Sequence, residues 1–220
     1  MNLRKSEIVM LAIVVLSFAI AIYFFPQMPE QVASHWNSNG EVNGYMDSFW
    51  GTFLMPVISV LLLLMFLAIP RIDPLKANIE RFRKHYDRLI IITMAFMLYI
   101  YLLTIAWNLG MRFDMARLLL PALAVLFYFI GGVLKESKRN WFVGIRTPWT
   151  LSSDAVWEKT HKRGALLFRL FALVVLIGLF VPGQTVLIVL VPVLAGTIYL
   201  VAYSYFEYRK ETKHAGKGKR

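Results

Sequence analysis

The pattern of hydrophobic and polar positions divides the chain into six long apolar runs separated by polar segments. The runs lie at residues 6–25, 50–69, 89–108, 117–134, 165–181 and 185–205. A helix rises about 1.5 Å per residue, so about 20 apolar residues cross a hydrocarbon core about 30 Å thick. The runs lack the apolar and polar alternation of barrel strands, and lipid cannot satisfy an open backbone. The pattern therefore predicts an all-α membrane protein with six transmembrane helices.

The polar segments between the runs predict how the chain is organised. We expect an N-terminal two-helix unit at 1–70, a cytoplasmic amphipathic loop at 71–88, helices three and four at 89–134, a cytoplasmic loop at 135–164, helices five and six at 165–205, and a basic disordered tail at 206–220. The first run contains an Ala-Ile-Ala string that resembles a signal-peptide cleavage site. Because apolar residues continue past that string, we expect an uncleaved first helix.

The distribution of positive charge predicts the orientation. With the N-terminus in the cytoplasm, 22 of the 24 Lys and Arg residues fall in cytoplasmic segments, and only Arg112 and Arg117 fall outside. This asymmetry follows the positive-inside rule, so both termini are expected in the cytoplasm of a multi-pass cell-membrane protein. Hydrophobic residues make up 58% and charged residues 17%, which excludes an ordinary soluble domain. Anionic membrane lipids account for the net charge of +11 without direct nucleic-acid binding.

The sequence lacks the residues that most membrane chemistry requires. It has no cysteine, which excludes thiolate catalysis and iron–sulfur clusters. No carboxylate falls in the central turns of the predicted helices, which disfavours an ion-coupled transporter. The few hydroxyls there are expected to form hydrogen bonds between helices. Metalloprotease, nucleophile-elbow and phosphate-loop motifs are absent from the sequence, so we expect no catalytic site, no cofactor and no metal.

Two other classes of protein stay open at this point. One is a membrane transporter, or a lipid- or peptide-handling protein, that works without ion-coupling carboxylates. Such a protein would need a polar path between its helices, for which Asn108 and Thr104 are the candidates. The other is a membrane enzyme that uses His35 or His161.

The external loop at residues 26–48 is predicted to fold back on itself. Asn-Gly dipeptides at 39–40 and 43–44 favour a compact turn or hairpin. The loop has no cation and three carboxylates, Glu30, Glu41 and Asp47. An anionic loop with aromatic residues suits a cationic or amphipathic ligand. The alternatives are a loop anchored in the interface by tryptophan, and a metal site formed by His35 with Glu41 or Asp47.

The loop at 71–88 is predicted to form a short amphipathic helix. Asp73 and Pro74 are typical of a helix start. Ile79, Phe82 and Tyr86 recur at helical spacing and would share one apolar face.

The loop at 140–161 is expected to begin extended at Thr147 and then to enter a helix capped by Ser152 or Ser153. Trp157 and His161 would stack one turn apart in that helix. Arg146 would stack on a neighbouring indole or bind a lipid phosphate.

Three strings of residues resemble a known family. They are His35-Trp36-Asn37 with Gly40 and Gly44-Tyr45, then Pro70-Arg71-Ile72-Asp73-Pro74, and then Asn140 to Ser152 with Arg146-Thr147-Pro148-Trp149, followed by Val156-Trp157 and Thr160-His161. They resemble the SdpI family, whose members begin with a short domain of the DUF1648 type. Asn43 departs from the pattern, because an aspartate is expected before Gly44-Tyr45.

The resemblance implies a function and two groups of site residues. It implies a non-enzymatic immunity protein against a secreted membrane-active peptide toxin, with membrane lipids, the toxin and a cytoplasmic DNA-binding repressor as partners. The expected external ligand-binding group comprises His35, Trp36, Asn37, Gly40, Gly44 and Tyr45. The expected cytoplasmic signature loop comprises Asn140, Gly144, Arg146, Thr147, Pro148, Trp149, Trp157 and His161.

Overall fold

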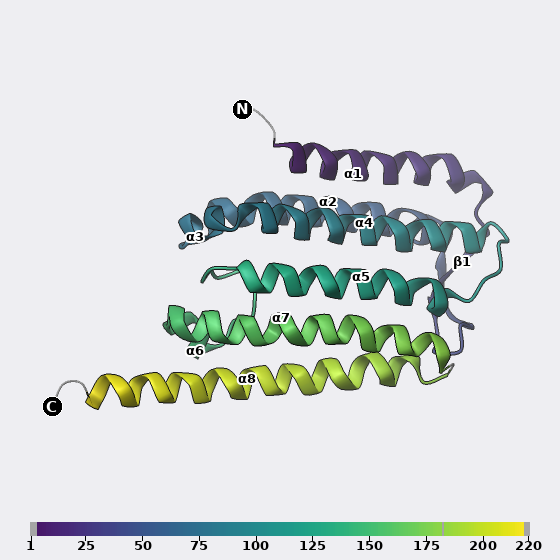
Figure 1. Ribbon diagram of the computed structural model, residues 1–220. Helices are drawn as coiled ribbons and strands as arrows, with labels where there is room; N and C mark the ends of the chain where they lie inside the picture. The colour runs from purple at the N-terminus through teal and green to yellow at the C-terminus, as the bar shows by residue number, and fades with distance from the viewer. Residues whose placement is uncertain (1–3, 182, 218–220) are drawn as a thin grey trace.

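The computed structural model describes residues 4–181 and 183–217, and six long helices contain most of them. These are α1 (Lys5–Phe24), α2 (Ser48–Ile72), α4 (Arg83–Asn108), α5 (Met115–Glu136), α7 (Asp154–Ile177) and α8 (Thr185–Lys217). The helices run side by side in a layered bundle (Figure 1). All six are long and apolar enough to cross a membrane. The predicted membrane fold with six transmembrane helices is confirmed.

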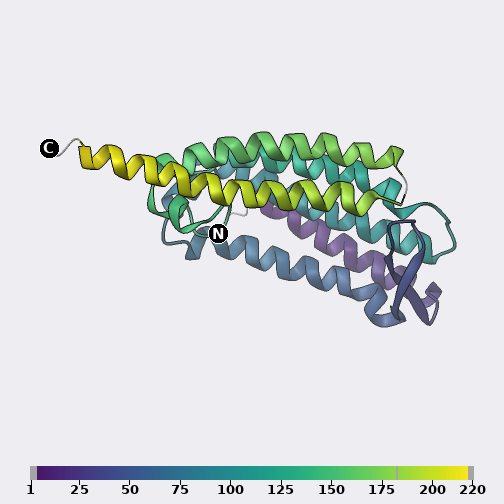
Figure 2. The ribbon, with the colours of Figure 1, turned by 90° about the horizontal axis from the view of Figure 1, so that it is seen from below.

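The short elements lie at the two ends of the bundle. One end holds the 3-10 turns η1 (Phe25–Gln27) and η2 (Gly178–Phe180) and an antiparallel hairpin of β1 (Gln31–Trp36) and β2 (Val42–Asp47). The other end holds α3 (Lys76–Arg81), α6 (Pro148–Ser152) and the first and last described residues (Figures 1 and 2). The predicted structured loop is therefore a two-stranded sheet, which adds a small β element to the α-helical fold.

The bundle consists of two groups of helices. Helices α1, α2 and α4 contact one another, α7 contacts both α5 and α8, and α4 meets α5 between the groups. Glycine permits a close approach of α5 and α7, because a Cβ atom on Gly131 would lie 2.8 Å from the carbonyl oxygen of Ala165. Small residues at such crossings are typical of helices that pack in membranes.

Large apolar side chains cover the outside of the bundle. Val15 is 60% exposed, Leu173 is 63% exposed and Ile198 is 71% exposed. Water would penalise so much exposed apolar surface, whereas lipid does not. The outer surface of the six helices is therefore suited to contact with hydrocarbon.

Most hydroxyls in the bundle bond within their own helix, which corrects the prediction of bonds between helices. Five hydroxyls donate to the carbonyl oxygen three or four residues earlier in the same helix. They belong to Ser17, Ser59, Thr93, Thr104 and Thr197. That carbonyl is always within reach of a short side chain on a helix. The longer tyrosines do connect helices: Tyr86 donates to the Phe66 carbonyl at 2.7 Å.

Two predicted boundaries differ in the structure. Helix α7 continues without a break from Asp154 to Ile177, so part of the predicted loop at 135–164 belongs to the fifth long helix. The prediction of a disordered tail from residue 206 is wrong for the described residues, because α8 continues to Lys217 and extends beyond the other helices (Figure 2). Glu207 is 7% exposed and pairs at 2.9 Å with both Lys159 of α7 and Lys210. These ion pairs fix the first turn of the extension, and Glu, Lys and Arg favour helix in the rest.

The amphipathic helix predicted at 71–88 is divided in two. Helix α3 has only six residues, and the chain turns at Phe82 before α4 begins at Arg83. Ile79, Phe82 and Tyr86 are all buried, as their spacing predicted, but they pack inward on the α1–α2–α4 group. Asp73 ends α2 and does not begin α3.

Candidate functional site

The hairpin is held against the bundle by Asn108, the last residue of α4. Its side-chain Oδ1 accepts from the N–H of Ala33 at 2.8 Å, and its Nδ2 donates to the C=O of Ala33 at 3.0 Å. The same nitrogen also donates to the Thr104 carbonyl. Ala33 is fully buried, so its two backbone groups have no access to water and need these partners.

The turn of the hairpin is built on Asn37. Its Oδ1 accepts from the backbone N–H groups of Asn39 and Glu41, and its Nδ2 donates to the Glu41 carboxylate at 2.9 Å. Gly40 follows with a φ of +79°, which favours glycine, and a Cβ there would lie 3.0 Å from Oδ1 of Asp114. Asn37 and Gly40 therefore shape the turn and seat it on the loop before α5.

His35 lies opposite Gly44 at an irregular point in the strand pairing. Its Nδ1 lies 2.5 Å from Oδ1 of Asn43, the residue that departs from the family pattern. A Cβ on Gly44 would lie 2.9 Å from the Cβ of His35. His35 and Tyr45 are exposed, so these two side chains are available to a ligand.

The carboxylates of the hairpin are used in the fold and do not converge on His35. Asp47 caps α2 by accepting from two backbone N–H groups of its first turn, and Glu41 accepts from Asn37. Within residues 4–181 and 183–217, no three His, Cys, Asp or Glu side chains are grouped so that they could hold a metal ion.

Trp36 stands between two apolar clefts beneath the hairpin. Its ring packs edge-on against Trp107 at 5.6 Å, and its buried Nε1 has no hydrogen-bond partner among the described residues. The first cleft, of about 370 Å³, is lined beside Trp36 mainly by Leu54, Met55, Ile100, Thr104, Met115 and Leu119. The second, of about 320 Å³, is lined mainly by Met115, Leu119, Leu123, Val186, Val189 and Leu190. Both volumes lie within the range of small-ligand sites.

At the opposite end, Asn140 organises the signature loop. It is fully buried, and its Oδ1 accepts from the N–H groups of Phe142 and Val143. Its Nδ2 donates to the carbonyls of Lys138 and Val143, both at 2.8 Å. All of the hydrogen-bonding capacity of this amide is therefore used to fold the loop.

Gly144 and His161 fit together in the same loop. His161 stacks on Trp157 at 3.9 Å, as predicted, and its Nε2 accepts from the backbone N–H of Ile145 at 2.9 Å. Gly144 has a φ of +122°, and a Cβ there would overlap the imidazole Nε2. The Trp157 indole donates to the Ser137 carbonyl. His161 is thus a buried side chain whose two ring nitrogens both lie within hydrogen-bond distance of backbone groups, Nε2 near the N–H of Ile145 and Nδ1 near the carbonyl of Trp157.

Thr147 joins the loop to α8. Its backbone is extended, as predicted, and its hydroxyl caps α6, where Pro148 is the first residue. Thr147 and Thr150 exchange hydrogen bonds in a capping box, and Oγ1 of Thr147 also lies 3.0 Å from Oγ of Ser204. Trp149 packs edge-on against Tyr205 at 5.1 Å. Ser153 caps α7, one of the two caps predicted.

Arg146 is an exposed member of this group. Its guanidinium donates to the Trp141 carbonyl at 2.5 Å. It borders a cleft of about 530 Å³ between the loop and helices α7 and α8. This arrangement leaves other guanidinium N–H groups available for a lipid phosphate, the second of the two roles predicted for Arg146.

Sequence reasoning missed two residues that connect the ends of the two helix groups. Asp73 is buried, and its carboxylate accepts from the N–H groups of Leu75 at 2.6 Å and Trp141 at 2.9 Å. Asn78 donates to the Arg139 carbonyl at 2.8 Å. The signal for Asp73 was present, because it lies in one of the strings that carried the family resemblance.

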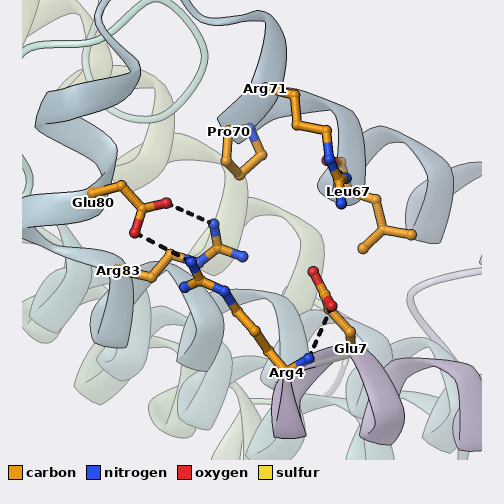
Figure 3. Close-up of a pocket in the computed structure, with 7 residues that line it drawn as sticks. All are labelled: Arg4, Glu7, Leu67, Pro70, Arg71, Glu80 and Arg83. Atoms are coloured by element: carbon orange, nitrogen blue, oxygen red, sulfur yellow. Dashed lines mark hydrogen bonds and ion pairs between the residues drawn. The ribbon is translucent and has the colours of Figure 1, made fainter. Parts of the chain in front are cut away.

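An ion-pair network attaches the start of α1 to α3 and α4. Glu80 binds Arg4 at 3.4 Å and Arg83 at 3.2 Å, and Glu7 accepts from the backbone N–H of Arg4 (Figure 3). The network surrounds a small pocket of about 140 Å³.

The two predicted groups are each brought together, but they lie at opposite ends of the bundle (Figure 1). The ligand-binding group is on the hairpin, and the signature loop lies beside α3 and α6. A single site that includes both groups is therefore ruled out by the distance between the ends of the helices.

Comparison with known protein families gives one match that includes the hairpin and another that includes the signature loop. The model of a domain of unknown function, DUF1648, matches residues 12–60, and that of the SdpI/YfhL protein family matches residues 136–204. Together the two matches support an SdpI-family assignment for the chain. A curated relative, Immunity protein SdpI from Bacillus subtilis (strain 168), is 22% identical over 210 residues, which cover 94% of this chain and 97% of the relative. No solved structure matches the chain.

The two matches cover separate parts of the chain. The first contains the whole hairpin and the predicted ligand-binding group, and the second contains the whole signature loop with α6, α7 and most of α8. Asp73 and Asn78 lie between the matches, in the segment that connects them.

Proposed function

We propose that this protein is a membrane immunity protein that protects its cell from a secreted, membrane-active peptide toxin. The observation that carries the proposal is the pairing of an anionic hairpin with two apolar clefts on either side of Trp36. A cationic amphipathic peptide offers the complementary surfaces, because its charges suit the carboxylates and its apolar side chains suit the clefts. The similarity to Immunity protein SdpI supports this assignment.

The exposed residues of the hairpin make the first contacts in this proposal. His35 and Tyr45 are accessible on the strands, and Glu30 lies just before β1. The unpartnered Nε1 of Trp36 donates to a carbonyl of the bound peptide, which satisfies a buried donor that has no partner within the described chain. Asn37, Gly40 and Gly44 hold this surface in shape.

The orientation of the protein in the cell membrane is part of the same proposal. The hairpin faces outward, where a secreted toxin arrives, and both termini are cytoplasmic. The support is the distribution of Lys and Arg, of which 22 of 24 lie in segments assigned to the cytoplasm.

We further propose that the signature loop relays the occupancy of the hairpin to a cytoplasmic DNA-binding repressor. Its fixed geometry supports this role, because Asn140 and Gly144 define one backbone conformation while Arg146 and Trp141 stay exposed. A two-hybrid assay with neighbouring regulator genes tests it, and the exposed side chain of Arg146 is the first to replace. Binding that is insensitive to toxin would contradict the relay.

The transport alternative receives less support from the geometry. The Asn108 amide, which was to line a polar path, is used by Ala33 and Thr104, and the Thr104 hydroxyl donates to the Ile100 carbonyl. The enzyme alternative with His161 meets a similar difficulty, because the ring is enclosed by Trp157 and bonded to Ile145.

The decisive experiment is protection of a sensitive bacterium that expresses the protein. Leu119→Trp fills both clefts from the α5 side, whereas the neighbouring exposed Leu118→Trp adds the same bulk outside them. We expect killing by the peptide to return with Leu119→Trp and not with Leu118→Trp, at equal membrane abundance. Equal protection by both variants would contradict binding in the clefts, and unchanged killing with the wild-type protein would contradict immunity itself.

A further inference from the structure

A polar cavity lies at the end of the bundle opposite the hairpin. Its volume is about 240 Å³, and it is bounded by α3, by the end of α5 with the residues that follow it, and by the start of α7. Trp157 and His161, which are both buried, also line it. This volume exceeds the share of a single water, about 30 Å³, several-fold.

Four cationic side chains line this cavity, Arg81, Lys135, Lys138 and Arg139. They come from both sides of the junction between the helix groups, because Arg81 belongs to α3 and the others lie at or just after the end of α5. Two carboxylates, Asp154 and Glu158, also line it.

The carboxylates do not neutralise the cavity. Asp154 pairs with Arg139 at 2.8 Å, and Glu158 pairs at 2.8 Å with Lys162, which does not line the cavity. Within the described residues, Arg81 and Lys138 have no carboxylate within 4.0 Å. Arg81 and Lys138 therefore line the cavity without a direct ion-pair partner, and Glu158 contributes a more distant negative charge near Lys138.

The small pocket near the N-terminus differs in this respect. It is lined by three arginines, but Arg4 and Arg83 share the Glu80 carboxylate and Arg71 donates to the Leu67 carbonyl (Figure 3). Its cations are therefore engaged within the protein. The cavity beside α3 is the better anion site because two of its four cations, Arg81 and Lys138, have no ion-pair partner among the described residues.

We propose that the cavity beside α3 binds a phosphate group, carried either by a soluble phosphate compound or by the headgroup of an anionic lipid. Arg81 binds from the α3 side and Lys138 from the α5 side through charge-assisted hydrogen bonds. Arg139 stays paired with Asp154 and adds positive potential at the rim. Because the bound anion joins α3 to the α5–α7 junction, its binding stabilises the folded protein.

The site is tested by thermal unfolding of the purified full-length protein in nanodiscs of phosphatidylcholine. Inorganic phosphate is the first probe, compared with chloride at equal ionic strength, and phosphatidylglycerol added to the nanodisc is the second. We expect phosphate, phosphatidylglycerol or both to raise the unfolding temperature. A shift with phosphate identifies a soluble anion, and a shift with phosphatidylglycerol alone identifies a lipid headgroup.

Variants assign the effect to the cavity. Arg81→Gln with Lys138→Gln should weaken binding of the effective probe by about tenfold or more, because both charge-assisted bonds are lost. The control, Lys84→Gln with Arg88→Gln, removes the same charge from exposed positions on α4 and should leave binding unchanged. Glu158→Gln removes a carboxylate from the rim and should strengthen binding.

The inference is overturned if neither probe stabilises the wild-type protein more than chloride does. It is equally overturned if the stabilisation persists in the double variant of the cavity or disappears in the control. Should the double variant fail to fold, Glu158→Gln decides the question, since unchanged or weaker binding there contradicts a cationic site. These outcomes do not depend on toxin protection, so they can be separated from those of the proposed function.

Discussion

The side-chain amide of Asn108 bonds both backbone groups of Ala33, at 2.8 Å and 3.0 Å, and so occupies the outer edge of β1. An isolated two-stranded hairpin is at best marginally stable in water. The end of α4 thus supplies what a third strand would supply, and the hairpin becomes a rigid part of the bundle.

Replacement of Asn108 by alanine should therefore release the hairpin. It leaves two buried backbone groups of Ala33 without partners, and we expect a loss of about 2–4 kcal/mol in the free energy of unfolding. Limited proteolysis should then cut between residues 31 and 47. Asn39→Ala is the matched control, because that exposed side chain lies at the turn and makes no such bond within the described residues. Equal protease resistance of the two variants would contradict the anchoring role.

Gly144→Ala should damage the signature loop. The new Cβ would overlap Nε2 of His161 at a φ that alanine rarely adopts, so we expect about 2–5 kcal/mol of destabilisation. Gly132→Ala is the control: no atom lies within 4 Å of a Cβ there, and alanine favours the helix. Thermal unfolding in detergent measures both. A Gly144 variant as stable as the Gly132 variant would mean that the loop readily adopts another backbone path.

Asp73→Ala should loosen the junction between the helix groups. Both carboxylate oxygens accept backbone N–H groups in a buried setting, and we expect a cost of about 2–4 kcal/mol. Asp73→Asn keeps one acceptor and should cost less. Hydrogen exchange at the amide of Trp141 reports the bond directly, and exchange at the wild-type rate in Asp73→Ala would disprove it.

Glu207→Gln should weaken the extension of α8. The loss of the pairs with Lys159 and Lys210 is expected to cost about 1 kcal/mol and to speed amide exchange after residue 207 roughly fivefold. Glu211→Gln, at an exposed position of the same helix, serves as the control. If both variants exchange alike, the ion pairs do not hold the extension.

The proposed orientation can be tested without removing any native cysteine, because the chain has none. Asn39→Cys on the hairpin turn should react with a membrane-impermeant maleimide added to intact cells. Ser152→Cys at the end of α6 should react only after the membrane is opened, because the positive-inside rule places it in the cytoplasm. Labelling of both residues from the same side would exclude the arrangement that we propose.

The six long apolar runs predicted all six membrane helices, and two Asn-Gly dipeptides predicted the hairpin. These features are local in sequence, so the residues concerned carry the signal themselves. The stacking of Trp157 on His161 and the cap at Ser153 were predictable for the same reason, since each involves residues within one turn.

The contacts that locate the two candidate groups were not predictable in this way. Asn108 and Ala33 are 75 residues apart, and Asp73 and Trp141 are 68 apart. Their bonds depend on how the helices assemble, which the apolar runs do not determine. The prediction of a disordered tail was wrong for a related reason. The composition of the tail is polar and basic, but the carboxylate of Glu207 forms an ion pair with a lysine of another helix.

Helix α7 runs unbroken from Asp154 to Ile177, with Trp157 and His161 near its first turn. At about 1.5 Å per residue, its 24 residues form a stiff rod as long as a bilayer core is thick. A rod without a joint transmits rotation and axial sliding over its whole length. Any force that turns it at the η2 end must also shift the indole and imidazole at the other, so the two surfaces of the membrane are mechanically linked through one piece of backbone.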